Sequence, residues 1–167
     1  MSNLILRVGF HAKAAVKKLF FKTIYGKQVF FGKNVCFRRN FFLFIEKGGK
    51  VSIGDGCYFN NDVSINCLES ISIGKNCLIA ENVKLYDHNH RFRDFSKPMS
   101  EQGFTHKPIT IGDDCWLCAN VTVLQGVTIG NHCVIGANCL IYKDVPDNTI
   151  VRNETKQVMY PIENKGD

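Results

Sequence analysis

Two histidines and an acidic residue stand together at positions 87–90, where the sequence reads Asp87-His88-Asn89-His90. A histidine exchanges a proton near neutral pH, so one side chain can act first as a general base and then as a general acid. The twenty residues 89–108 follow at once and lack the regular pattern of their neighbours. Long loops in compact proteins are usually functional. We therefore take His88 as a candidate base, with His90 and Asp87 as a possible second base or support.

The elements that must position these side chains are six-residue repeats. Blocks of three hexads open with Val51-Ser-Ile-Gly, Ile71-Ser-Ile-Gly, Ile109-Thr-Ile-Gly and Val127-Thr-Ile-Gly, and a more degenerate block opens at Val29. Apolar residues at alternate positions predict short strands with one buried face. The glycine that follows is expected to permit a turn. Stacked hexads of this kind predict an all-β fold, a parallel β-helix of about five coils with three strands each.

The interruptions of the repeats fix the organisation of the chain. Residues 47–50, 69–70 and 89–108 each follow a third hexad, so every insertion leaves the same corner and His88 is the last residue of its coil. We expect an N-terminal helix or cap at 1–26, a β-helix domain at 27–151 with the loop 89–108, and a tail at 152–167. No stretch has the length and apolarity of a membrane span, so an intracellular, cytoplasmic protein is expected.

The positive charge is concentrated at the start of the chain. Residues 1–45 hold nine Lys or Arg and no acid, although the net charge of the whole sequence is only +6. Residues 4–24 predict a helix with Ile5, Val8, Ala12, Ala15, Val16 and Leu19 on one side and most of its cations on the other. Such a helix could cap the β-helix core, bind an anionic membrane surface through residues 1–25, or do both. The segment has no nucleic-acid-binding motif.

The eight cysteines do not form a metal or disulfide pattern. Cys57, Cys77, Cys115 and Cys133 all take the first position of a second hexad, so we expect small, buried, reduced thiols that stack along the core. Cys115 and Cys118 alone would supply only half of a zinc site, and no metal is expected.

Residues 29–160 resemble the hexapeptide-repeat acyltransferases. The segment 107–130, followed by Val134-Ile-Gly-Ala and Lys143-Asp-Val-Pro, is similar to the maltose, galactoside and bacterial polysaccharide O-acetyltransferase branch, and the segment 87–90 resembles the catalytic segment of its polysaccharide-modifying members. The resemblance implies a left-handed β-helix and a homotrimer with sites between subunits. It also implies acetyl-CoA as co-substrate and a saccharide acceptor from a surface glycan or its precursor.

The resemblance also implies roles for individual residues. Trp116 is the only tryptophan and should face outward, so it is assigned to the acetyl-donor pocket, with subunit packing as the alternative. Asn60 matches an acceptor-binding asparagine, and Tyr58, which lies on the same outward column as Trp116, is expected to line the acceptor side. Positions matching the coenzyme A site are Ala119, Ala137 and Lys143. The C-terminal segment departs from the family pattern, and Arg152 or Lys156 is expected to replace its usual cation.

These assignments predict direct acetyl transfer in a ternary complex, with His88 from one chain meeting Trp116 of the next. A sugar N-acetyltransferase shares the fold and the donor and stays open as an alternative. A γ-type carbonic anhydrase would need three converging histidines around zinc. A non-catalytic scaffold would leave the histidine segment, the long loop and Trp116 without a common explanation.

Overall fold

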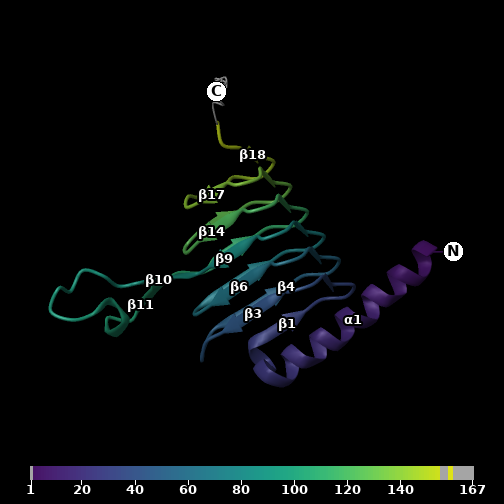
Figure 1. Cartoon of the computed structure of the whole chain (residues 1–167), viewed down its shortest axis with the longest axis horizontal. Coiled ribbons are helices and arrows are strands. Elements are labelled where there is room, and N and C mark those ends of the chain that lie inside the picture. Colours follow the sequence, from purple (N-terminus) through teal and green to yellow (C-terminus); the bar gives the residue numbers. More distant parts are fainter. Residues whose placement is uncertain (1, 155–157, 160–167) are drawn as a thin grey trace, which may run out of the picture.

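Three parallel β-sheets form the faces of a tapering prism in the computed structural model, which describes residues 2–154, 158 and 159, with side chains from Ala14 onward (Figure 1). The first face contains β1 (Val29–Phe31), β4 (Lys50–Ile53), β7 (Ser70–Ile73), β12 (Ile109–Ile111) and β15 (Thr128–Ile129). The second contains β2 (Cys36–Phe37), β5 (Tyr58–Phe59), β8 (Leu78–Ile79), β13 (Trp116–Leu117), β16 (Val134–Ile135) and β18 (Ile150–Val151). The third contains β3 (Phe42–Ile45), β6 (Ser64–Cys67), β9 (Lys84–Tyr86), β14 (Thr122–Leu124) and β17 (Leu140–Ile141). The chain visits the faces in rotation, which confirms the predicted parallel β-helix of about five coils.

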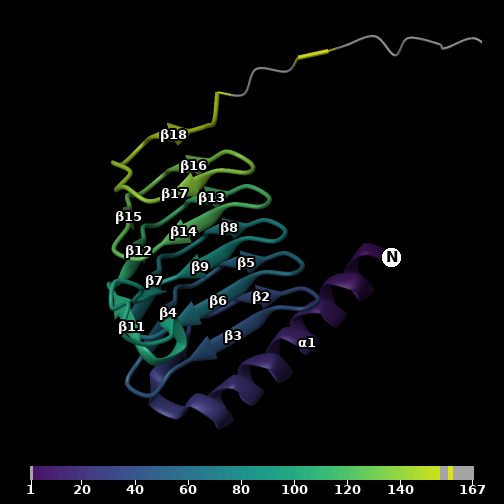
Figure 2. The same ribbon diagram turned by 60° about the vertical axis from the view of Figure 1, so that its left-hand side comes forward.

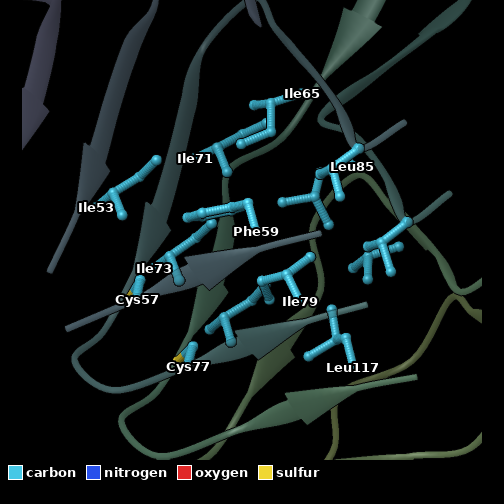
Figure 3. Close-up of a cluster of buried hydrophobic side chains, with 14 of the residues drawn as sticks. Ile53, Cys57, Phe59, Ile65, Ile71, Ile73, Cys77, Ile79, Leu85 and Leu117 are labelled. Carbon is cyan, nitrogen blue, oxygen red and sulfur yellow. The ribbon is translucent and has the colours of Figure 1, made fainter. Parts of the chain in front are cut away.

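The core is a column of side chains that are stacked coil upon coil (Figure 3). Strand partners keep equivalent positions in register, as in Ile53 opposite Ile73 and Phe59 opposite Ile79. Each coil therefore buries its apolar residues against the coils above and below, which is why one hexad repeat cannot fold alone. The buried cysteines belong to this column, and no disulfide forms among the described residues.

The glycine of each leading hexad serves a different purpose from the one its position suggests. At Gly54 a Cβ atom would stand 2.6 Å from the carbonyl oxygen of Gly74 in the next coil. The positive φ needed at the corners is taken by polar residues instead, for example Asn76 at 56° and Asp114 at 55°. Glycine is thus required because neighbouring coils approach closely, and not because it frees the turn as the sequence analysis expected.

Helix α1 (Ser2–Tyr25) lies across the open end of the first coil, and the 3₁₀ turn η1 (Gly26–Gln28) joins it to β1 (Figure 2). Phe21 is buried there with its ring 6.3 Å from Phe31 and 5.8 Å from Phe41. This supports the capping role. The helix directs a cation toward the prism, since Lys17 donates to the Arg38 carbonyl at 2.5 Å, while the apolar Leu19 is 68% exposed.

The long excursion begins at the corner between the third and first faces, as predicted. It contains an antiparallel hairpin, β10 (His88–His90) with β11 (Phe104–His106), and the 3₁₀ turn η2 (Met99–Glu101). Figure 1 shows it projecting from the side of the prism. The handedness of the β-helix, implied by the resemblance alone, stays a prediction.

Candidate active site

Asp87 closes the corner from which the hairpin leaves. It follows β9 and is the one charged or polar residue that is buried among the described residues, with an exposure of 0%. Its Oδ1 accepts the backbone N–H of Leu68 at 2.8 Å, and its Oδ2 accepts those of Glu69 and Ser70 at 2.8 and 3.0 Å. Three main-chain donors satisfy the buried carboxylate, so its position is fixed by the fold.

His88 lies against this carboxylate. Its Nδ1 is 3.2 Å from Asp87 Oδ1, and its side chain is 18% exposed. The ring also packs edge-on against Phe104, with centroids 5.4 Å apart. Because the carboxylate can only accept, it favours a proton on Nδ1, which leaves the lone pair of Nε2 free to take a proton from another molecule.

His90 lies on the same strand but in a different environment. It is exposed, and its ring is 4.4 Å from that of Phe104. It also lines a hollow of about 670 Å³ inside the excursion, which has the size of a small-molecule site. The structure thus places one histidine on a buried carboxylate and the other on the wall of a hollow.

The sequence does not predict one contact at the base of the hairpin. His106 pairs with His88 across β10 and β11, and its Nδ1 is 2.8 Å from Glu69 Oε2. His106 is exposed as expected, with half of its side chain accessible. Glu69 also gives its backbone N–H to Asp87, so this pair ties the returning strand to the corner that holds the carboxylate. No sequence signal indicates it, since 37 residues separate the partners.

Trp116 and Tyr58 both point outward from the second face. Leu78 lies between them in the strand ladder, opposite Tyr58 on one side and Trp116 on the other. This confirms that they share one column, two coils apart. Trp116 is 49% exposed and Leu78 is 51% exposed, so an apolar surface is left open here.

The other assigned residues are distributed along the edges of the prism. Ala119 and Ala137 stack on the corner that follows the second face, where the side chains of Asn120 and Asn138 are hydrogen-bonded. Asn60 occupies the same corner in an earlier coil. Its amide accepts from Arg38 and donates to Glu81, so it belongs to a polar ladder.

The cationic positions lie toward the C-terminal end. Lys143 is exposed after β17, with its Nζ 5.7 Å from the centre of the Tyr142 ring. Arg152 is exposed after β18. Lys156 lies outside the described residues.

Within one chain, His88 and Trp116 are not brought together. His88 stands at the corner between the third and first faces, whereas Trp116 projects from the second face on the other side of the core. Among the described residues there is also no group of three His, Cys, Asp or Glu side chains that could hold a metal ion. The zinc alternative therefore finds no ligand set in this part of the chain.

Comparison with known proteins identifies the repeats. Residues 108–143 match the model of the bacterial transferase hexapeptide, and residues 50–86 match that of the hexapeptide repeat of succinyl-transferase. The colanic acid biosynthesis acetyltransferase WcaF of Escherichia coli is 31% identical over 144 residues, which cover 85% of this chain and 73% of the relative. The chain belongs to the hexapeptide-repeat acetyltransferases.

Two further proteins are similar to this hexapeptide-repeat acetyltransferase. WbbJ of Escherichia coli, which carries the name of a lipopolysaccharide biosynthesis O-acetyl transferase, is 37% identical over 110 residues, or 62% of this chain and 56% of its own. A hexapeptide-repeat acetyltransferase of Vibrio cholerae, solved with acetyl-CoA, has a TM-score of 0.68 and 31% identity over 81% of this chain and 70% of its own. The family resemblance seen in the repeats is thereby confirmed, although the chain spans little more than half the length of WbbJ.

Proposed function

We propose that this protein transfers an acetyl group from acetyl-CoA to a hydroxyl group of a sugar that belongs to a surface glycan or its precursor. The observation that carries the proposal is the Asp87–His88 pair beside the hollow of the excursion. Support for the donor comes from the relative that was solved with acetyl-CoA, and support for the acceptor comes from the names of WbbJ and WcaF.

The chemistry follows from the geometry of the pair. His88 Nε2 takes the proton of the sugar hydroxyl while the hydroxyl oxygen attacks the carbonyl carbon of the thioester. The resulting tetrahedral intermediate expels the coenzyme A sulfur, and the same imidazole returns the proton to that thiolate. Asp87 holds Nδ1 and stabilises the imidazolium between these two steps. Backbone N–H groups and the indole N–H of Trp116 are our candidates for stabilising the oxyanion.

The donor site in this proposal lies between subunits of a homotrimer. Trp116, Ala119 and Ala137 share the second face and its edge, where small side chains would let an extended pantetheine arm approach the backbone. Lys143 would bind phosphate, and Lys156 keeps that role as a prediction. A neighbouring chain would then supply His88, since His88 and Trp116 of one chain lie on different sides of the prism.

One observation favours His90 as the alternative base, because His90 and not His88 lines the hollow. The two assignments are separated by measuring transfer from radiolabelled acetyl-CoA to free, nucleotide-linked and lipid-linked sugars. We expect His88→Ala to lower kcat by about 10²- to 10⁴-fold. An unimpaired His88→Ala together with an inactive His90→Ala would make His90 the base. A wild-type protein that neither transfers acetyl groups nor binds acetyl-CoA would refute the proposed function.

We also propose that α1 contacts an anionic membrane surface. Val16, Leu19, Phe20 and Ile24 form an exposed stripe on it, between 55% and 70% accessible, while Phe21 caps the core. Among the described residues, no helix has the length and apolarity to cross a membrane. A cytoplasmic location at the inner face of the cell membrane remains the prediction made from the sequence.

A further inference from the structure

Hydrogen bonds within the excursion fix the side chains and backbone around the hollow. The side chain of Gln102 accepts the backbone N–H of Asp94 at 3.1 Å and donates to the carbonyls of Asp94 and Lys97 at 2.8 and 3.1 Å. Thr105 and Gln125 are joined at 3.3 Å, which connects the returning strand to the next coil. These hydrogen bonds join the two arms of the loop and fix the walls of the hollow.

Most of the charged side chains that line this hollow are positive. Arg91, Arg93 and Lys97 line it together with a single acid, Asp94. The Asp94 carboxylate is already used by its own loop, since Oδ1 accepts from the hydroxyl of Ser96 at 2.6 Å and Oδ2 is 3.3 Å from Lys97 Nζ. The same contacts lower the pKa of Asp94, so it stays ionised and engaged.

The two arginines are left without a carboxylate. In the part of the chain that the structure describes, no acidic side chain lies within ion-pair distance of Arg91 or Arg93. The Arg93 guanidinium lies 5.9 Å from the centre of the Phe92 ring, so its donors remain available at its edge. Arginine is always charged, and its planar fork matches a carboxylate or a phosphate in a bidentate way.

The lining of the hollow also contains groups suited to sugar hydroxyls. Asn89, Thr105 and Gln125 contribute neutral polar groups there. Gln125 Oε1 is buried and has no hydrogen-bond partner among the described residues. A buried acceptor without a donor is unfavourable, and a small reorientation of the amide toward a ligand hydroxyl would satisfy it.

We infer that the hollow binds the anionic part of the acceptor, so that the preferred substrate is a sugar bearing a carboxylate or a phosphate. Arg91 and Arg93 bind the negative group, and the neutral polar side chains of the lining bind hydroxyls. His90 lines the same hollow and is two residues from His88, the candidate base. This inference rests on the proposed acetyl transfer for its meaning, but the binding that it predicts can be measured without any reaction.

The test compares ligands that differ in charge. Methyl glucuronide, glucose 1-phosphate, UDP-glucose and the neutral methyl glucoside are titrated calorimetrically into the full-length protein in the presence of coenzyme A. We expect each favoured anionic ligand to bind at least about tenfold more tightly than methyl glucoside, with an advantage that shrinks at high salt. The carboxylate and phosphate arms show which anion is preferred.

Substitutions test whether the two arginines of the hollow cause the preference for anionic ligands. Arg91→Gln combined with Arg93→Gln should weaken anionic ligands about 10- to 100-fold and leave methyl glucoside within about twofold. Arg39→Gln is the matched control, because Arg39 is an exposed arginine at a corner of the first coil, outside the lining of the hollow. It should change neither class of ligand.

The outcomes distinguish this inference from the proposed function, because acetyl transfer to the same four sugars is measured in parallel. Equal binding of neutral and anionic sugars, or an unchanged double variant, overturns the inference even where acetyl transfer succeeds. Tighter binding of anionic sugars that is lost in the double variant supports the inference. If no sugar is acetylated in that case, only the proposed function fails.

Discussion

Asp87 has two roles, which can be distinguished by comparing a substitution of Asp87 with one of His88. It satisfies three backbone N–H groups at the corner, and it faces Nδ1 of His88. It also lies beside Cys67, where burial and the neighbouring carboxylate raise the pKa of the thiol to about 12. That thiol is therefore neutral at physiological pH.

Asp87→Asn should impair both roles. An amide turns an NH₂ group toward main-chain donors, so we expect about 1–3 kcal/mol less stability in urea unfolding. It also ceases to stabilise the imidazolium, so kcat should fall at least about 10²-fold. His88→Ala is the control, because it should lose activity while it keeps the corner and most of the stability. Full activity in Asp87→Asn would contradict the paired assignment.

Glu69→Gln tests how the hairpin is held. The ion pair of Glu69 with His106 is half exposed, so its loss should cost no more than about 1 kcal/mol. We expect a higher KM for the acceptor with little change in kcat, because the returning strand carries part of the hollow and not the base. Glu101→Gln, at an exposed site of the same loop, provides the comparison. A large fall in kcat with an unchanged KM would place Glu69 closer to the chemistry.

The sequence predicted the site only where neighbours in the chain make it. Asp87 and His88 are adjacent, and the hexad register alone placed them at the corner before the long loop. Glu69 with His106, and Gln125 with Thr105, are brought together by the path of residues 91–103, which follows no repeat. Such contacts depend on how a loop folds back, and no periodicity encodes that.

At the scale of elements, glycine sets how closely the coils can stack. Gly54→Ala should be severely destabilising, by about 3 kcal/mol or more, because the new Cβ would meet the backbone of Gly74 at 2.6 Å and backbone cannot easily move aside. Gly48→Ala is the contrasting variant. Gly48 has a φ of 96° but open space around it, so only conformational strain, of about 1 kcal/mol, is expected. Similar urea midpoints for the two variants would refute the packing explanation.

Helix α1 presents two faces that can be tested apart. Phe21→Ala removes a buried ring from the cap and should destabilise the fold by about 3 kcal/mol. Phe20→Gln changes a residue that is 59% exposed, so it should leave thermal stability almost unchanged and reduce flotation with anionic liposomes. Undiminished flotation of Phe20→Gln, or of a chain that lacks residues 1–25, would refute the membrane contact.

At the scale of the whole molecule, the outward columns of the first and second faces differ. The outward column of the second face is apolar along its length and runs through Cys36, Tyr58, Leu78, Trp116, Val134 and Ile150. The first face has Phe30 at the start of the equivalent column, followed by Ser52, Ser72, Thr110 and Thr128. The inward pattern of the hexads was enough to predict the fold, since burial within a coil is local. The contrast between these outer faces emerges only once the strands are in register, and it supports our proposal of a subunit interface at the second face.

Mixed subunits test this interface and the site together. If His88 of one chain meets Trp116 of the next, His88→Ala and Trp116→Ala should each be inactive as homotrimers. Coexpressed in equal amounts, they should regain about a quarter of the wild-type activity, because half of the chains carry an intact His88 and half of their neighbours an intact Trp116. Coexpression of His88→Ala with Asp87→Asn should restore nothing, since both changes damage the same half of the site. No recovery in the mixture of His88→Ala and Trp116→Ala, or an active monomer in sedimentation, would mean that a single chain holds the complete site, and the opposite positions of His88 and Trp116 on the prism would then have no catalytic meaning.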